Sequence, residues 1–152
     1  MKSNSKKPLV SIIMNCYNGE KYLKESIKSI INQTYKNWEL IFWDNVSSDN
    51  SKDLISKYLD KRIKYFYSKN FYKLYKSRNL AIENASGKFI SFLDTDDIWE
   101  KDKIEKQINF FNQHTEYEIV YSNYFVYDQI KKKKYIQFKN RLASGIIFND
   151  LV

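Results

Sequence analysis

Cysteine, proline and glycine are all scarce in this chain of 152 residues, and each shortage excludes a class of protein. The single cysteine, Cys16, cannot form an intramolecular disulfide, so a disulfide-stabilised secreted scaffold is excluded and a reducing compartment fits. One proline and three glycines argue against a disordered or linker-rich chain, because 43% of the residues are hydrophobic and 17% are aromatic. The length and composition predict one folded globular domain, residues 1–152, with a real core.

Long hydrophobic runs are absent as well. The apolar stretch that follows the basic N-terminal residues is far too short for a signal peptide, and nothing approaches the roughly 18 apolar residues of a membrane span. We therefore expect a cytoplasmic protein, with attachment to the inner face of the membrane left open. The single histidine, His114, falls near the end of a predicted helix and is expected at the surface rather than in a metal site.

Positive charge is in excess, with a formal net charge of +8. This excess favours an anionic partner: a small molecule, a nucleic acid or a membrane surface. No nucleic-acid partner is expected, because the tyrosines fall in strand and helix patterns and no RNA- or DNA-binding motif is present. The run from Lys131 to Lys134 is interpreted as a solvated turn, and peripheral membrane association is the lesser hypothesis, at about 1 kcal/mol per basic residue.

Short apolar runs alternate with segments of helical periodicity over residues 8–115. This alternation predicts an α/β fold with a mostly parallel sheet flanked by helices. Strands are expected at residues 10–14, 38–43, 63–67 and 89–93. Helices are expected at residues 20–33, 75–85 and 101–112, and around Leu54, Ile55, Tyr58 and Leu59, with Asp49 as the cap of that last helix. Residues 116–152 predict a C-terminal β-hairpin, with EIVYSNYFVYD and KKKKYIQFK as its strands.

Polar clusters follow three of the predicted strands. They read NCYNGE after the first strand, DNVSSDN after the second and DTDD after the fourth. Ligands of open α/β sheets bind at the carboxyl ends of the strands, so three clusters at this edge predict a binding site there.

The DTDD cluster admits three chemistries. An EF-hand calcium loop is rejected, because Trp99 takes the position that requires glycine. A phosphohydrolase of the haloacid-dehalogenase type uses a similar motif, but on its first strand, and stays a weak alternative. In the third chemistry, Asp94 and Asp96 bind Mg²⁺ or Mn²⁺, which holds the diphosphate of a nucleotide. Against all three stands a structural role, in which Asp96 or Asp97 only begins the next helix.

The order of these motifs resembles that of the family 2 glycosyltransferases of the GT-A fold. The resemblance rests on VSIIMNCYNGEKYL, IFWDNVSSDNS and SRNLAIENASGKFISFLDTDDIW, and it covers most of residues 9–112. It implies transfer of a sugar from a nucleotide donor, usually a UDP-sugar, with a divalent metal and with inversion at the anomeric carbon. It also implies a glycan or lipid-linked acceptor, as in the synthesis of lipopolysaccharide or other surface polysaccharides.

The resemblance assigns roles to particular residues. A site for the nucleotide-sugar is implied at Asn15, Tyr17, Asp44, Asn45, Arg78, Asp94 and Thr95. Within it, Tyr17 and Asn15 would border the base, Asp44 and Asn45 would bind uracil and ribose, and Arg78 would meet the base or the diphosphate. The metal ligands would be Asp96 and Asp94, with Asp96 in direct contact.

Two departures from the family pattern bear on this reading. The family usually has Asp-Asp-Gly-Ser after the second strand, where this chain has Asp44-Asn45-Val46-Ser47. Asn45 can still accept a hydrogen bond but lacks the charge, and Val46 disfavours a positive φ, so a different loop is expected. The family's general base is a carboxylate beyond the metal motif, and no residue of this chain is assigned to that role. We therefore expect residues 8–115 to form the donor-binding core and residues 116–152 to begin an acceptor region that is missing.

Two functions from different classes remain open at this point. The first is an inverting, metal-assisted glycosyltransferase. The second is a nucleotide-sugar-binding module without transferase activity.

Overall fold

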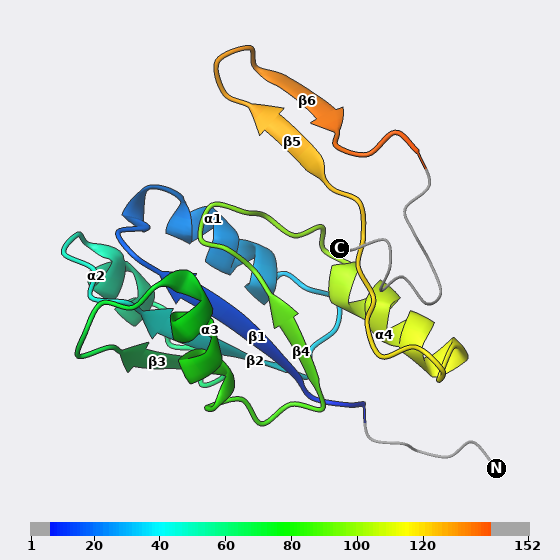
Figure 1. The fold of residues 1–152 in the computed structure, drawn as a ribbon, viewed down its shortest axis with the longest axis horizontal. Coiled ribbons are helices and arrows are strands. Elements are labelled where there is room, and N and C mark those ends of the chain that lie inside the picture. Colours follow the sequence, from blue (N-terminus) through cyan, green and yellow to red (C-terminus); the bar gives the residue numbers. More distant parts are fainter. Residues whose placement is uncertain (1–6, 141–152) are drawn as a thin grey trace. The chain divides into compact units, whose positions relative to one another are not determined.

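The computed structural model describes residues 7–140 of the chain. Contacts divide it into two compact units, which part between Glu105 and Lys106. The first unit contains the alternating strands and helices, and the second contains the hairpin (Figure 1). None of the helices in the described range has the length and apolar composition to cross a membrane.

The first unit is built on a four-stranded parallel sheet (Figure 1). Its strands are β1 (Val10–Cys16), β2 (Trp38–Asp44), β3 (Ile63–Tyr67) and β4 (Phe89–Phe92), in the spatial order β3-β2-β1-β4. The connecting helices are α1 (Glu20–Ile31), α2 (Ser51–Ser56) and α3 (Leu74–Ile82). The predicted α/β fold with a mostly parallel sheet is confirmed.

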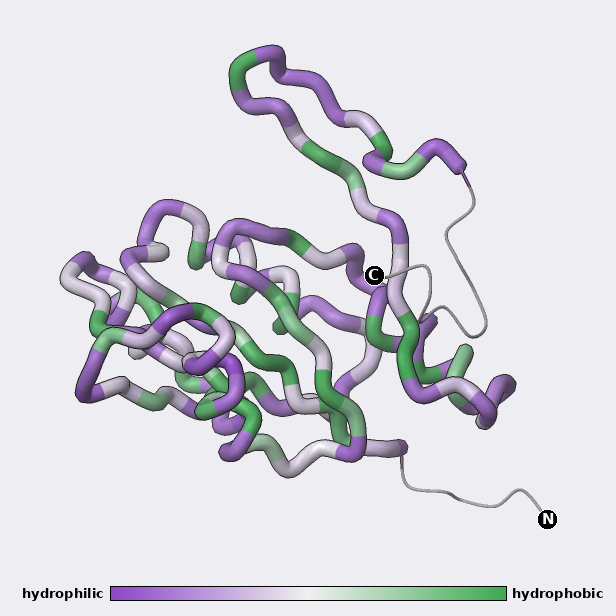
Figure 2. Tube along the Cα trace, viewed as in Figure 1, coloured by the Kyte–Doolittle hydropathy of each residue, from purple (hydrophilic) through white to green (hydrophobic). Residues whose placement is uncertain are grey.

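Both central strands are buried along nearly their whole length, which explains why their sequences read as apolar runs. Alternate residues face opposite sides of the sheet. Ile13, Ile41 and Trp43 pack with Ala81 of α3 on one side. Right-handed crossovers place α1 and α2 on the other side, where Leu23 and Ile27 of α1 are buried. In Figure 2 the hydrophobic stretches accordingly lie along the strands at the centre of this unit.

A buried carboxylate, that of Glu39, ties three strands together near the amino end of the sheet. Its Oε1 accepts hydrogen bonds from Ser11 Oγ (2.6 Å) and from Ser86 N (2.7 Å). Its Oε2 accepts one from Lys64 Nζ (2.6 Å). Gly87 donates its N–H to the same Ser11 hydroxyl, and a Cβ at Gly87 would lie 2.6 Å from Ser11 N, so only glycine fits there. This network fixes the chain between α3 and β4 against the sheet.

Three helices end earlier than the sequence predicts, and the first of them, α1, ends at Ile31 ahead of the predicted residue 33. Helix α2 ends at Ser56, and Leu59, which was expected on its apolar face, is 98% exposed. Helix α3 ends at Ile82, ahead of the predicted residue 85. Leu59 gains no burial that would extend α2, whereas Ala85 packs against the core although it lies past the end of α3, so apolar spacing alone does not fix a helix end.

The second unit contains the predicted hairpin but with shorter strands. Helix α4 (Lys103–Gln113) runs into it, and β5 (Phe125–Asp128) pairs antiparallel with β6 (Lys133–Ile136). The expectation of a strand from residue 118 is wrong, because residues 118–124 form no regular element and Ile119 is 80% exposed. The predicted acceptor region extends past residue 140, outside the described residues.

Candidate functional site

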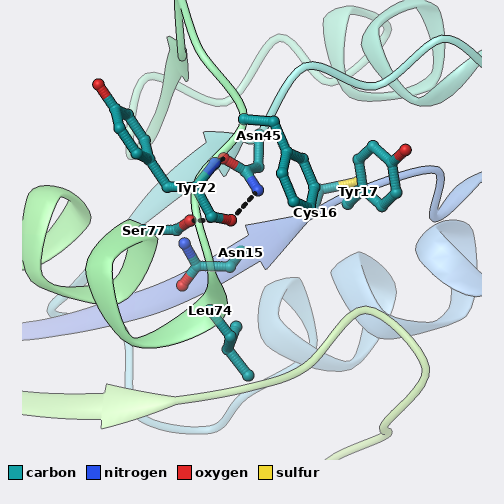
Figure 3. A pocket seen from close by; sticks show the side chains of 8 residues that line it. Asn15, Cys16, Tyr17, Asn45, Tyr72, Leu74 and Ser77 are labelled. Atoms are coloured by element: carbon teal, nitrogen blue, oxygen red, sulfur yellow. Dashed lines mark hydrogen bonds between the residues drawn. The ribbon is translucent and has the colours of Figure 1, made fainter.

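A pocket of about 150 Å³ lies at the carboxyl edge of the sheet, beside the first turn of α3 (Figure 3). It is lined by Asn15, Cys16, Tyr17, Asn45, Phe71, Tyr72, Leu74 and Ser77. Ligands of open α/β sheets bind at this edge, and the pocket lies at the carboxyl ends of β1 and β2. A cavity of this size accommodates a benzene-sized ring.

Asn15 is the polar group of this pocket that is left without a partner. Its Oδ1 and Nδ2 are both buried, and neither finds a hydrogen-bond partner among the described residues. Buried amides are normally satisfied, and an unsatisfied one costs about 1–3 kcal/mol. The side chain offers one acceptor and two donors to whatever enters the pocket.

Asn45, in contrast, is fully engaged by the protein. Its Nδ2 donates to the carbonyl oxygen of Tyr72 (2.8 Å), and its Oδ1 accepts from Tyr72 N (3.1 Å). These two hydrogen bonds to the main chain of Tyr72 hold the segment before α3 in place as a wall of the pocket. An aspartate could not donate to the carbonyl oxygen, which gives a physical reason for an amide at this position.

Asp44 is completely buried and is absent from the pocket wall. Its Oδ1 accepts from Ser47 N, and its Oδ2 accepts from Tyr65 Oη, both at 2.8 Å. Burial, together with this hydrogen bond and the charge of Asp44, raises the pKa of Tyr65. The carboxylate thus shapes the loop after β2, and the structure leaves it no exposed surface for a ligand.

Val46 adopts a positive φ of 67° in that loop, which corrects the expectation that a β-branched residue would force a different conformation. The left-handed region costs an L-residue about 1–2 kcal/mol. Asp44, which accepts from Ser47 N, and Ser47 Oγ, which accepts from Asn18 N (3.0 Å), hold the turn in place. Strained backbone of this kind tends to gather at functional sites.

Replacing Val46 with glycine is expected to raise the free energy of unfolding by about 1 kcal/mol, because glycine adopts a positive φ without strain. Val46→Ala is the matched control, since it keeps the Cβ that causes the strain. Thermal denaturation of both variants tests this. A gain for alanine as large as that for glycine would contradict the explanation.

Two aromatic rings stand at the mouth of the pocket. Tyr17 packs edge-to-face against Phe71, with ring centroids 4.8 Å apart, and both rings are more than half exposed. Neither ring therefore belongs to the core. Exposed ring faces of this kind are available for stacking on a planar ligand.

The DTDD loop begins beside the pocket. Ile13 of β1 is paired with Phe92, the last residue of β4, and Asn15 and Asp94 each follow two residues later along the chain. Asp94 Oδ1 accepts from Arg78 Nη2 (2.6 Å), which joins two of the predicted site residues. Both side chains are partly exposed, so this ion pair can exchange with a ligand at small cost.

Thr95 and Asp97 are held through their main chains. The hydroxyl of Ser26 on α1 lies 2.7 Å from the carbonyl oxygen of Thr95 and 2.5 Å from that of Asp97. The side chain of Thr95 lies against Gly19, where an added Cβ would come within 3.2 Å of it. Helix α1 therefore sets the conformation of the loop, and the side chain of Asp96 stays exposed.

The carboxylates of this loop fit a hard divalent cation. The loop concentrates negative charge. Partial burial, together with repulsion from Asp96 and Asp94, accordingly raises the pKa of Asp97. In the part of the chain that the structure describes, no three His, Cys, Asp or Glu side chains are arranged to hold a metal by themselves. Mg²⁺ in nucleotide sites needs only one or two carboxylates, because substrate phosphates supply further ligands.

Several lining residues were not predicted from the sequence. Phe71, Tyr72, Leu74 and Ser77 come from the segment before α3 and from its first turn. The one signal for them is the aromatic character of FYKLY, which a chain rich in tyrosine masks.

The fold is that of GT-A glycosyltransferases, and solved structures bear this out. TarS of S. aureus (residues 1–349) superposes with a TM-score of 0.67 at 29% identity, covering 70% of this chain and 33% of that one. TarS has also been solved in complex with UDP and with UDP-GlcNAc. A mannosyltransferase of Pyrobaculum calidifontis, solved with GDP-Man and Mn²⁺, has a TM-score of 0.65 at 19% identity and covers 70% and 33%, which shows the fold alone.

The chain belongs to the glycosyl transferase family 2, whose family model matches residues 11–149. One relative is the UDP-Glc:alpha-D-GlcNAc-diphosphoundecaprenol beta-1,3-glucosyltransferase WfgD of Escherichia coli. It is 43% identical over 124 residues, which are 78% of this chain and 49% of WfgD. The chain spans about half the length of the curated relatives that it matches. The phosphohydrolase alternative is set aside.

Proposed function

We propose that this chain provides the donor-binding part of an inverting glycosyltransferase that uses a UDP-sugar. The observation that carries the proposal is the unpartnered amide of Asn15 in a ring-sized pocket, on the strand whose neighbour, β4, leads into Asp94. The pocket would take the base, and the carboxylates would face the diphosphate. The size favours a single-ring pyrimidine over a purine, and relatives in complex with UDP agree with that choice.

Individual residues then take distinct parts in binding. Asn15 would hydrogen-bond the edge of the base, while Tyr17 would stack on it. Asn45 and Asp44 would act as positioning residues, since their polar atoms are already bonded to the protein. Arg78 would exchange Asp94 for the diphosphate or the ribose.

Asp96, with Asp94, would hold Mn²⁺ or Mg²⁺ against the diphosphate. Bound there, the ion would neutralise charge that develops on the leaving diphosphate. The exposed Asp96 carries this assignment better than Asp94, which is paired with Arg78.

The acceptor would be a glycan or lipid-linked hydroxyl of a cell-surface polysaccharide pathway. WfgD, by its name, acts on a lipid-linked diphosphate. The present chain matches 49% of the length of WfgD, and this likeness supports such an acceptor. Activation of the acceptor requires a general base, and no described carboxylate is assigned to it. A nucleotide-sugar-binding module without turnover is therefore the second candidate function.

Release of UDP from UDP-glucose and from UDP-GlcNAc separates the two candidates. Metal-dependent release that increases when an acceptor is added would establish the transferase, because the sugar then passes to the acceptor rather than to water. Binding of the same donors without release would establish the module.

Replacing Asp96 with alanine is expected to weaken the Mn²⁺-dependent part of UDP binding at least tenfold, because a bridging carboxylate is lost. Glu83→Ala, at an exposed position just after the end of α3, changes the net charge equally and is the matched control. Titration of UDP into each variant at fixed Mn²⁺ tests this. Equal losses for the two variants would mean that only overall charge matters and would refute direct ligation.

A further inference from the structure

We propose that the turn of the β5–β6 hairpin docks on an anionic membrane surface. This inference goes beyond the donor site, because it rests on the second unit alone. The turn connects Asp128 to Lys133, which are paired across the hairpin. In Figure 2 the turn combines a short hydrophobic stretch with a longer hydrophilic one.

The first observation is an isoleucine held outward at the tip. Ile130 is 95% exposed. Its position is fixed, because Asp128 Oδ1 accepts hydrogen bonds from Ile130 N (3.0 Å) and Lys131 N (2.9 Å). An apolar side chain presented by an ordered turn can enter the boundary between headgroups and acyl chains without first paying to order the loop.

The second observation is an exposed aromatic face behind the tip. The register pairs Phe125 with Ile136 and Tyr127 with Lys134, which places these four side chains on one face of the hairpin. Phe125, Tyr127 and Ile136 are all exposed. Aromatic side chains with a polar end or a polar neighbour prefer the level of the lipid headgroups.

The third observation is the charge at the tip. Lys131 to Lys134 are four consecutive exposed lysines, and Lys131 lies 3.9 Å from Asp128, the one acidic residue of the turn. Lys134 Nζ lies 4.2 Å from the centre of the Phe125 ring, so charge and aromatic surface are presented together. Basic residues next to apolar ones are the composition of elements that lie in anionic interfaces.

A membrane explains this combination better than other partners do. Lysine is depleted in the cores of protein interfaces, whereas it is concentrated here beside Ile130, an apolar side chain that is 95% exposed. A nucleic acid would account for the lysines but would gain nothing from Ile130. An acceptor that is linked to a lipid would be met at the same surface.

Co-sedimentation of the full chain with vesicles tests the proposal. We expect binding to vesicles of phosphatidylcholine with phosphatidylglycerol, little binding to phosphatidylcholine alone, and weaker binding as salt is raised. The variant Lys131→Gln, Lys133→Gln, Lys134→Gln should lower the partition coefficient about 100-fold. Lys52→Gln, Lys57→Gln, Lys61→Gln removes the same charge from exposed positions in the first unit and should bind almost as the wild type does.

Ile130→Trp tests the insertion separately from the attraction of charge. Its fluorescence, after subtraction of the wild-type spectrum, should shift to the blue when anionic vesicles are added. The proposal would be overturned if the spectrum did not change or if the chain did not sediment with anionic vesicles. It would also be overturned if both triple variants lost vesicle binding equally. Equal salt-dependent binding to single-stranded DNA and to vesicles, unaffected by Ile130→Ser, would assign the surface to nucleic acid instead.

Discussion

An Asn15→Leu variant is expected to unfold at a higher temperature than the wild-type chain and yet to bind UDP at least tenfold more weakly. In the free protein the amide of Asn15 is buried without a partner, and leucine of similar volume removes that penalty. We expect a gain of about 1 kcal/mol in the free energy of unfolding. In the complex the same amide would bond the base, so its loss removes hydrogen bonds worth the tenfold change.

The opposite signs of the two effects make this variant informative. Asn84→Leu is the matched control, because Asn84 Nδ2 donates to the carbonyl oxygen of Leu80 (2.9 Å), away from the pocket. That change should lower stability slightly and leave UDP affinity alone. If Asn15→Leu destabilised the chain and left affinity unchanged, Asn15 would be a structural residue whose partner is missed, and the base site would lie elsewhere.

Glu39→Gln is expected to lower the free energy of unfolding by about 2 kcal/mol at pH 7, since three donors converge on this buried carboxylate. Burial alone would raise the pKa of Glu39, but hydrogen bonds from Lys64, Ser11 and Ser86 outweigh it and hold the pKa below its ordinary value of 4.5. The stabilisation is therefore present above pH 4.5 and is lost as the pH falls through the lower pKa of the folded state.

Denaturation in urea between pH 7 and pH 3 checks both parts of this expectation. The difference between the wild type and Glu39→Gln should shrink as the pH falls below 4.5. Glu25→Gln alters an exposed carboxylate on α1 and should show neither the loss nor the pH window. A difference for Glu39→Gln that grows on acidification would reverse the sign and contradict the network.

Local sequence pattern was enough to predict the fold of the first unit. Strands β1 and β2 are buried on both faces, and such strands read as unbroken apolar runs. Polar clusters that interrupt these runs can only lie at strand ends. The sequence therefore predicted a binding site at the carboxyl edge of the sheet. The ends of α1, α2 and α3 were missed, because the spacing of apolar residues continues past the point where each helix stops.

The sequence could not predict which residues of the site are hydrogen-bonded to the protein and which are left for a ligand. Asp44 and Asn45 look like equivalent polar residues in the chain, and their partners, Tyr65 and Tyr72, come from distant segments. Only the packed structure shows that both are engaged by the protein, while Asn15 is left unpaired. Val46 was misjudged for a related reason, since hydrogen bonds around it enforce a φ that its side chain opposes.

The central claim is that the pocket and the DTDD loop together bind a nucleoside diphosphate. Calorimetric titration of UDP into the folded chain, first with Mn²⁺ and then with EDTA, tests it most directly. We predict binding of one UDP with Mn²⁺ and a loss of at least tenfold in affinity with EDTA. The absence of heat with Mn²⁺, from a chain shown to be folded, would contradict the claim and leave the family fold without its donor site.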